Sequence, residues 1–524
     1  MAIKRKSIFA GALMLTSAGL ITRALGFVYR ISMSNTLGAE GMGLYQLIMP
    51  VYSLAWSIAC SGFTTTLSKL VAQENASRAY GNMGRALKQA IAITGVISLT
   101  LTAVLFFGAG AIGTHVFNDA RTVLPLRILS AAIPFMAAGS CIRGYFLGLR
   151  ETTEPAFGQV LEQCTRMAVV YLLAPLFLPR GLAYACAAAV IGIVAGECIA
   201  FAFSLTTYIR FKRKNNLTAP PTKSSRLLLT TMVGMALPLT ANRITGSFLS
   251  AWENTLIPQQ LRAFGMTQAE AVSAYGRING MALPLIFFPS AVLTALSVTL
   301  VPAISEAIAT DNRTKIRATA EKAIRFTCLV GICAAAVFLV LPDELGRVIY
   351  KQELGELLVP LAFLCPFWYL NAILGGILNG LGQQTFIFRN SLLSSAVNIG
   401  FIYFLVPLYG IQAFLWGWTL TLLCVTAISL AKIKAETGLR VSAPDWLYKP
   451  LLAALAAALL GELAANHIIF VWFHGFFALF AAAGLVGGLF LLAAFALGCF
   501  TSGELRLLLG GLRIRPRERA AAAN

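Results

Sequence analysis

Long apolar runs recur along the whole length of this chain, and they constrain its fold more than any other feature. A helix needs about 20 predominantly apolar residues to cross the hydrocarbon core of a bilayer. Only 12% of the residues are charged, whereas a soluble domain carries about 25%. The sequence therefore predicts an all-α polytopic membrane protein, and it excludes a soluble enzyme, a disordered chain and a fibrous protein. Fourteen apolar runs are predicted to be transmembrane helices: 7–33, 44–71, 86–112, 123–149, 156–178, 182–209, 227–250, 277–302, 324–342, 357–381, 386–407, 411–432, 447–466 and 476–500.

Basic residues are distributed unevenly between the predicted loops. With the N-terminus in the cytoplasm, 29 Lys and Arg residues fall inside and five fall outside. Cytoplasmic loops of membrane proteins are enriched in Lys and Arg, so we expect a cytoplasmic-membrane protein with both termini inside. The formal net charge of +20 reflects this asymmetry, and we expect no nucleic-acid partner. The inside set includes a group in the C-terminal tail: Arg506, Arg513, Arg515, Arg517 and Arg519.

An internal repeat appears at an offset of 232 residues. Six predicted spans separate the two copies, so both have the same orientation, which is typical of transporters whose halves meet at a central cavity. We therefore predict an N-lobe of spans 1–6 (1–209), a basic cytoplasmic linker (210–226), a C-lobe of spans 7–12 (227–433), and two extra helices with a basic tail (434–524). The repeat rests on the matches of Pro134, Gly144 and Gly148 with Pro366, Gly376 and Gly380.

Motifs for metal or nucleotide chemistry are missing from the sequence. The ten cysteines lie in apolar runs and form no CxxC, and neither HExxH nor GxxxxGK[ST] occurs. We therefore expect no metal site, no cofactor and no nucleotide-driven pump.

Seven arginines lie inside predicted spans or at their mouths. Each costs about 2.5–3.5 kcal/mol near the middle of a membrane on insertion scales. Acidic candidates inside the spans are few, so the surplus is cationic and indicates an anionic substrate. Arginine also matches phosphate oxygens bidentately. The seven are Arg23, Arg30, Arg127, Arg143, Arg166, Arg243 and Arg277.

Four of these arginines are predicted to bind substrate. Arg23 lies deep in the first span, and Arg30 follows two turns later on the same helix face. Arg243 lies mid-span in ANRITGSF, where we favour a role in a cavity. Arg277 lies near a span mouth, where snorkelling to lipid headgroups is the alternative.

Three further residues are open to a structural or a functional interpretation. Arg166 follows Glu162 by four residues on one helix face, so either an ion pair or a cavity role fits the pair. Arg143 begins RGYFLGLR near a cytoplasmic end, where anchoring of the loop is as plausible as a place in the cavity.

The stretches TRALGFVYRISMSNTLGAEGMGLYQL (22–47) and SGFTTTLSKLVA (61–72) resemble the polysaccharide transporter and lipid II flippase families, and above all the stage V sporulation protein B group. The run YGRINGMALPLIFFPSAVLTALSVTLVPAISEA (275–307) is similar to the start of the second lobe in MurJ-type flippases. The resemblance implies the multidrug/oligosaccharidyl-lipid/polysaccharide exporter fold, with two six-helix bundles around a central cavity. In it, Arg23 matches the first-span arginine that faces the cavity, and Arg277 matches the arginine that opens the eighth span.

The resemblance implies a flippase and not an enzyme. Its substrate would be an undecaprenyl-linked cell-wall precursor, lipid II-like or another lipid-linked oligosaccharide, moved by alternating access and, in the sporulation branch, used for spore cortex peptidoglycan. The expected partners are this substrate, membrane lipids and cell-wall synthesis proteins, with the chain itself a monomer. A cation-coupled multidrug antiporter of the same fold is the alternative. A membrane-embedded glycosyltransferase fits the sequence less well, because no acidic cluster or large loop occurs. A non-transporting scaffold also fits less well, because charges are costly to bury in a membrane.

Overall fold

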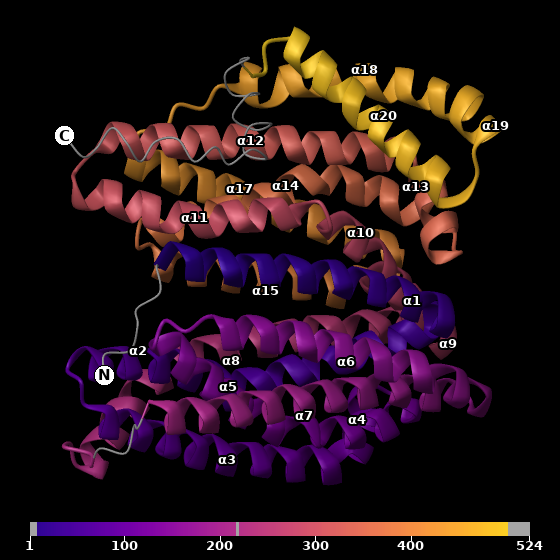
Figure 1. Ribbon diagram of the computed structural model, residues 1–524. Helices are drawn as coiled ribbons and strands as arrows, with labels where there is room; N and C mark the ends of the chain where they lie inside the picture. The colour runs from indigo at the N-terminus through magenta and orange to yellow at the C-terminus, as the bar shows by residue number, and fades with distance from the viewer. Residues whose placement is uncertain (1–7, 216–219, 501–524) are drawn as a thin grey trace. The chain divides into compact units, whose positions relative to one another are not determined.

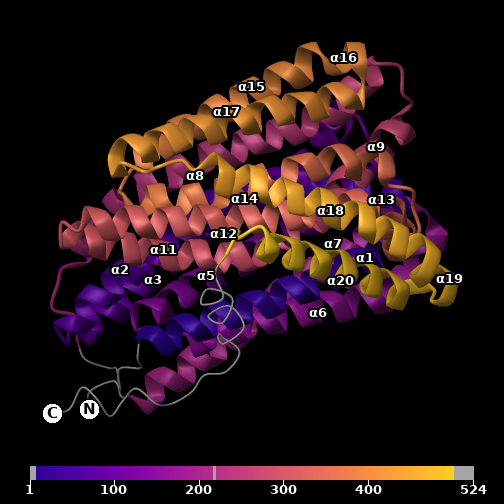
Figure 2. The same ribbon diagram turned by 90° about the horizontal axis from the view of Figure 1, so that it is seen from above.

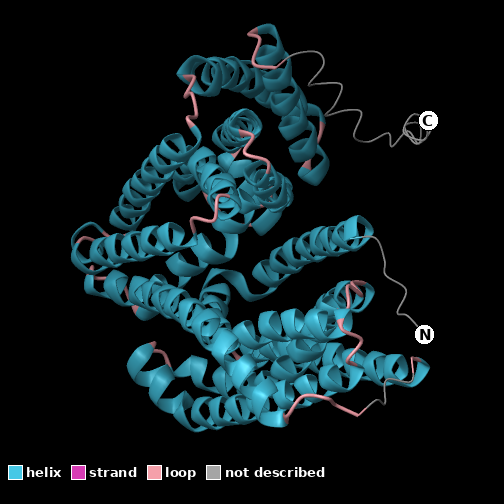
Figure 3. Cartoon of the chain, turned by 90° about the vertical axis from the view of Figure 1, so that its left-hand side faces the viewer, coloured by secondary structure: helices cyan, strands magenta, loops and turns pink. Residues whose placement is uncertain are grey.

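The structure is a computed structural model that describes residues 8–215 and 220–500. Within these ranges the chain consists of helices and loops and has no strand (Figure 3). The basic tail predicted at 501–524, with Arg506 to Arg519, lies outside the described residues.

Twenty α-helices and eight short π- or 3-10-helical turns follow one another along the described chain. The α-helices are α1 Ile8–Trp56, α2 Gly62–Ala76, α3 Tyr80–Ala111, α4 Val123–Ser130, α5 Ala132–Gly148, α6 Thr153–Phe177, α7 Leu182–Lys214, α8 Ser225–Ala263, α9 Gln268–Gly276, α10 Leu283–Phe287, α11 Ser290–Ala309, α12 Arg313–Val340, α13 Pro342–Leu345, α14 Gly355–Gly380, α15 Gln384–Phe404, α16 Val406–Tyr409, α17 Ile411–Thr437, α18 Lys449–Ala464, α19 Phe470–Trp472 and α20 Gly475–Ala496. The short turns are η1 Ser57–Ser61, η2 Ile112–Val116, η3 Ala120–Thr122, η4 Leu178–Arg180, η5 Arg277–Ala282, η6 Gly346–Tyr350, η7 Pro444–Tyr448 and η8 Ala465–Ile469.

The helices account for all fourteen predicted spans. In the described ranges, eleven helices are long and apolar enough to cross a membrane, or twelve if the pair bent by 41° at residue 131 is one span. The first candidate, Met14–Ala76, has 63 residues and would be roughly 95 Å long if straight. Gly38 interrupts it with a φ of 69°, so we divide it into two crossings. Adding α15, which Arg389, Asn390 and Asn398 make less apolar, gives fourteen.

One compact unit of the fold, unit 1, comprises Met1–Ala291 and Phe388–Thr421. In it α6 lies along α7, while α5 packs against α2, α3 and α7 (Figure 1). Because these helices are apolar on several sides, their contact faces form a core of large side chains. Its buried members include Phe63, Leu67, Met83, Tyr145 and Phe146.

The second compact unit, unit 2, comprises Val292–Ile387 and Leu422–Asn524. In it α12 packs against α14 and α18, and α18 packs against α20 (Figure 2). The guanidinium group of Arg325 donates hydrogen bonds to the carbonyl oxygen of Cys499, with Nε at 2.9 Å. This contact fixes the end of the α20 segment to α12. The two units are defined by contacts between residues, whereas the N-lobe and the C-lobe are predicted from the sequence repeat. The boundaries of the two lobes therefore stay a prediction.

Part of the predicted linker is bound to unit 1. The side-chain oxygen of Asn82 accepts hydrogen bonds from the backbone nitrogens of Thr222 (2.8 Å) and Lys223 (3.0 Å). Lys223 also forms an ion pair with the buried carboxylate of Glu74. These contacts fix residues 222–223 to α2 and α3, so this stretch is not a free tether.

The repeat at offset 232 corresponds to one helix contact that occurs in both units. In unit 1, a Cβ atom added to Gly144 of α5 would lie 2.7 Å from the carbonyl oxygen of Thr64 in α2. In unit 2, a Cβ atom added to Gly376 of α14 would lie 3.0 Å from the carbonyl oxygen of Ser297 in α11. Glycine permits this close approach of two membrane helices because it has no side chain. Gly148 and Gly380 repeat the contact one turn later.

Candidate functional site

A cavity of about 600 Å³ lies inside unit 1, between the inner faces of five helices. The walls come from α1, α2, α5, α6 and α7, which pack against one another. Most of these helices face apolar surroundings, yet the cavity gathers charged and hydrogen-bonding side chains. Its polar lining includes Tyr52, Thr64, Arg143, Gln159, Glu162 and Glu197. We call it the N-cavity.

Glu162 and Arg166 form an ion pair beside the N-cavity. The distance from Arg166 Nη2 to Glu162 Oε1 is 2.7 Å, and the two side chains are only 17% and 20% exposed. Their spacing of four residues on α6 places them on one face. The helix α7 approaches closely here, since a Cβ atom on Gly196 would lie 3.0 Å from the carbonyl oxygen of Glu162. Of the two interpretations of Glu162 and Arg166 from the sequence, an ion pair or a role in a cavity, this geometry is that of an ion pair.

Arg143 is the other cation of the N-cavity. Its Nη2 atom donates a hydrogen bond to Ser140 Oγ at 2.9 Å, one turn earlier on α5. Among the described residues, no carboxylate lies within ion-pair distance of its guanidinium group. Arg143 therefore presents hydrogen-bond donors to the N-cavity. Of the two interpretations from the sequence, anchoring of a loop or a place in the cavity, this position is that of a cavity residue.

Glu197 is the second carboxylate in the N-cavity. It lies on α7, its residue is only 3% exposed, and the hydroxyl of Tyr52 in α1 donates a hydrogen bond to its Oε1 atom at 2.5 Å. This contact joins α1 to α7 across the wall of the cavity. Unlike Glu162, Glu197 has no ion pair with any described residue.

Arg243 is adjacent to the N-cavity through an aromatic ring. Its guanidinium carbon lies 5.5 Å from the ring centre of Trp56, which lines the N-cavity. Next to Trp56, the hydroxyl groups of Ser57 and Ser247 are 2.5 Å apart and join η1 to α8. Turns with π-helical geometry are frequent at functional sites, and η1 places Trp56 beside α8.

Arg23 and Arg30 lie on α1 outside the lining of the N-cavity. Both side chains are exposed, and their separation of two turns places them on one helix face. Neither has an ion pair or a hydrogen bond with another described residue. The structure thus leaves both guanidinium groups available on one face of the first span, without bringing them to the N-cavity.

Arg277 lines a different cavity of about 650 Å³. It is the first residue of η5, and the walls of this second cavity also include Glu40, Phe264, Glu270 and Ser273. Of the four arginines predicted to bind substrate, Arg243 is therefore next to the N-cavity and Arg277 belongs to a second one.

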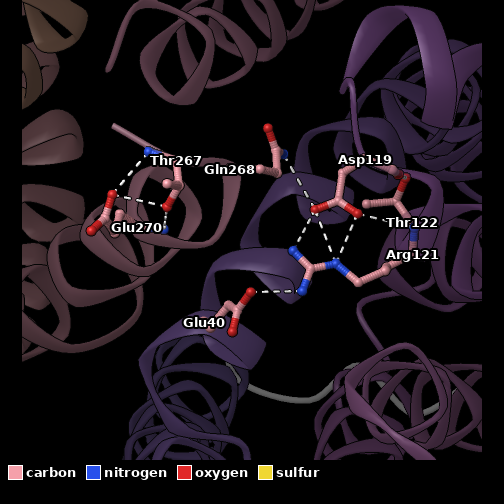
Figure 4. Close-up of polar contacts among 7 residues, drawn as sticks. All are labelled: Glu40, Asp119, Arg121, Thr122, Thr267, Gln268 and Glu270. Atoms are coloured by element: carbon pink, nitrogen blue, oxygen red, sulfur yellow. Dashed lines mark hydrogen bonds and ion pairs between the residues drawn. The ribbon is translucent and has the colours of Figure 1, made fainter. Parts of the chain in front are cut away.

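A polar network near the second cavity joins three segments of unit 1 (Figure 4). Arg121 contacts Glu40 at 2.6 Å and Asp119 at 2.8 Å, and Gln268 donates a hydrogen bond to Asp119 at 3.3 Å. Burial by itself raises the pKa of Asp119, but the side-chain and backbone hydrogen bonds from Arg121 hold the pKa of this carboxyl below its ordinary value. Two hydrogen bonds from Thr267 lower the pKa of Glu270, with which it forms a capping box at the start of α9.

Two members of the N-cavity could not be identified from the sequence. Tyr52 and Trp56 lie in an apolar run, and an aromatic residue there is usually part of a core. The sequence shows Glu197 as an acidic residue inside a predicted span, but it does not show that Tyr52 is its hydrogen-bond partner. Only the packing of α1 against α7 brings Tyr52 to Glu197.

Comparison with known proteins agrees with this architecture. Residues 8–308 match the family described as "Polysaccharide biosynthesis protein", and residues 262–404 match the family described as "MatE". The chain is 31% identical over 452 residues to "Stage V sporulation protein B" of Bacillus subtilis (strain 168), with 84% of this chain and 86% of that protein covered. It is 26% identical over 421 residues to "Lipid II flippase MurJ" of the same organism, with 72% and 74% covered.

Solved structures show the same fold. The lipid II flippase MurJ in an inward closed conformation aligns with a TM-score of 0.72 at 13% identity, covering 95% of this chain and 100% of that chain. An inward-facing multidrug resistance MATE family transporter of the MOP superfamily aligns with a TM-score of 0.63 at 14% identity, covering 83% and 98%. The resemblance found in the sequence is thus confirmed, and the chain is a multi-pass membrane protein that belongs to the polysaccharide biosynthesis protein family.

Proposed function

We propose that this protein is a flippase that moves an anionic, undecaprenyl-linked cell-wall precursor across the cytoplasmic membrane by alternating access. The observation that carries the proposal is Arg143, a guanidinium group that faces a 600 Å³ cavity and forms no ion pair with any described residue. Family membership supports it, since one relative is named a lipid II flippase and another a sporulation protein.

Among the described residues, the arrangement of charges in the N-cavity leaves one guanidinium group outside any ion pair. Arg166 neutralises Glu162 at 2.7 Å, so this acid does not attract a cation strongly. Arg143 and Glu197 both line the cavity but form no ion pair with each other. The planar guanidinium group of Arg143 matches the oxygens of a phosphate or diphosphate. An unpaired arginine among membrane helices is costly, which favours a functional role for it.

The exposed arginines of α1 extend this proposal. Arg23 and Arg30 would attract the diphosphate along the first span, and Arg243 and Arg277 would hold it at later stages. The polyprenyl tail would stay in the lipid while the sugar enters the protein. With the N-terminus inside, outward movement of negative charge is favoured by about 2.3 kcal/mol per charge per 100 mV. A role in spore cortex synthesis follows only from the sporulation relative.

The test is a translocation assay in proteoliposomes with a defined undecaprenyl-diphosphate oligosaccharide. A hydrogen bond to a charged group contributes about 1.5–3 kcal/mol, so Arg143→Gln should slow translocation by about 10–150-fold. Arg143→Lys should retain part of the rate. Arg127→Gln is the control, because Arg127 lies 6.0 Å from the ring centre of Phe106 and does not line the N-cavity. Wild-type translocation by well-folded Arg143→Gln would contradict the proposal.

A cation-coupled multidrug antiporter is the second candidate. The MATE transporter has a similar fold, and the N-cavity does contain two carboxylates, Glu162 and Glu197. An assay of organic-cation efflux separates the two candidates, because an antiporter would move such cations and would not require Arg143.

A further inference from the structure

Glu197 differs from the other acid of the N-cavity in forming no ion pair with a described residue, although Arg143 lines the same cavity. The residue is only 3% exposed, and Tyr52 donates a hydrogen bond to its Oε1 atom. In the described part of the chain, no Lys, Arg or His nitrogen lies within ion-pair distance of it. Glu162 would lose its 2.7 Å ion pair with Arg166 on taking up a proton, whereas Glu197 would lose none.

The charged and titratable groups around Glu197 come from each helix that packs against α7. Helix α1 contributes Tyr52, and α5 contributes Arg143. Helix α6 contributes Glu162 with Arg166, and also the buried Glu154, whose Oε1 atom accepts a hydrogen bond from Ser204 of α7. Helix α4 carries Arg127, which lies over Phe106 of α3. The short turns η3 and η4 contribute Arg121 and Arg180 near the beginning of α7, about 20 Å along that helix from Glu197.

We infer that Glu197 is a proton-binding site that sets the charge of the N-cavity, so that a proton and an anionic headgroup bind together. The inference rests on the proposed function, because it assigns a coupled ligand to the same cavity. Tyr52 is a positioning residue: it occupies Oε1 and leaves Oε2 to take up the proton.

The sum of charges gives the direction of the coupling. With Glu197 ionised, the charges of Arg143 and Arg166 balance those of Glu162 and Glu197. With Glu197 protonated, the same four groups carry one positive charge. The proton comes from water, forms an O–H bond at the carboxyl, and no other bond changes. An anion therefore binds the protonated cavity more tightly, and by linkage the bound anion favours uptake of the proton.

The experiment measures binding of a water-soluble, short-chain prenyl diphosphate sugar to the purified full-length protein in detergent at a series of pH values. Such a diphosphate is esterified at both ends, so its own charge stays constant near neutral pH. Calorimetry in buffers of different ionisation enthalpy gives the number of protons taken up. Glu197→Gln mimics the protonated state. Glu154→Gln is the matched control, because Glu154 is also buried and bonded to a hydroxyl, that of Ser204, but does not line the N-cavity.

We expect the wild type and Glu154→Gln to lose affinity as the pH rises, by up to about tenfold per pH unit for one linked proton. Binding should be accompanied by proton uptake in both. Glu197→Gln should bind tightly at every pH and take up no proton. A pH dependence in Glu197→Gln equal to that of the wild type would overturn the inference.

A second measurement separates this inference from the proposed function and does not need the Gln variant to fold. Infrared difference spectra during a pH titration without substrate should show the carbonyl stretch of a protonated carboxyl, and Glu197→Asp should shift that band. Absence of diphosphate binding, with this band present and shifted, would refute the proposed function and still support the proton site. Diphosphate binding with no such band in the wild type would overturn the proton site alone.

Discussion

Replacement of Gly144 by Ala tests the helix contact that occurs in both units of the fold. The new Cβ atom would lie 2.7 Å from the carbonyl oxygen of Thr64 and 3.2 Å from its Cα atom. Both are backbone atoms of α2, so no side chain can rotate away, and α5 must move outward. Overpacking of this kind typically costs about 1–3 kcal/mol.

A second glycine provides the control for helix propensity. Gly95 lies inside α3, and a Cβ atom there would meet nothing within 4 Å. Gly95→Ala should therefore stabilise the protein by about 0.4–1 kcal/mol. Since both substitutions gain the same helix propensity, the difference between them isolates the overpacking. We expect Gly144→Ala to be less stable than Gly95→Ala by about 1–3 kcal/mol.

The assay is unfolding of the purified variants in detergent, followed by circular dichroism. The Gly376→Ala variant tests the second copy, because its Cβ atom would lie 3.0 Å from the carbonyl oxygen of Ser297. It should be destabilised in the same direction. If Gly144→Ala proved as stable as Gly95→Ala, the close approach of α2 and α5 would be wrong, and with it the structural basis of the repeat.

Two further predictions concern ion pairs. Arg166→Met and Glu162→Gln should each destabilise the protein, toward the lower end of about 3–5 kcal/mol, because each leaves a partly buried charge or dipole without its partner. The double variant should be more stable than the sum of the single effects predicts, and strict additivity in denaturation would show that the 2.7 Å pair contributes nothing. The pKa of Asp119 lies below its ordinary value of 3.8, so its stabilising effect is complete above that pH and is lost as the pH falls through the lower folded value. Thermal unfolding should show this loss in the wild type and not in Asp119→Asn, and equal acid sensitivity of the two would remove Asp119 as its source.

The number of spans could be predicted from the sequence because hydropathy is set locally. The run predicted at 386–407 corresponds to α15, although that helix contains Arg389, Asn390 and Asn398 and is not among the eleven helices that are long and apolar enough to cross a membrane. The approximate position of the boundary between the first two spans could also be predicted from the sequence. Gly38 ends the first span by adopting a positive φ of 69°, a conformation that glycine adopts without steric cost.

The repeat was readable for a similar reason. Gly144 and Gly148 recur as Gly376 and Gly380, since each pair permits a close backbone contact that no other residue allows. Where close packing of two backbones permits only glycine, the same residue type occurs at both copies of the contact, and the repeat can be recognised from it. The helices that the glycines contact, α2 and α11, could not be read from the same pattern.

The partners inside the N-cavity could not be predicted, because they depend on how helices pack. The spacing of four residues indicated Glu162 with Arg166, a contact within one helix. Tyr52 and Glu197 are 145 residues apart and meet only through the contact of α1 with α7. The stacking of Arg243 on Trp56 likewise joins α8 to α1.

The three arginines in or beside the N-cavity are accommodated in three different ways, and the difference bears on function. Arg166 is held by a carboxylate at 2.7 Å, and Arg243 is stacked on an aromatic ring at 5.5 Å. Each arrangement recovers part of the cost of placing a charge among membrane helices. Arg143 forms no ion pair with a described residue and donates a hydrogen bond to the hydroxyl of Ser140 at 2.9 Å. A scaffold would gain stability from an apolar residue at this position, so the best reason for a guanidinium group there is an anionic ligand, which it would hold most tightly when Glu197 is protonated.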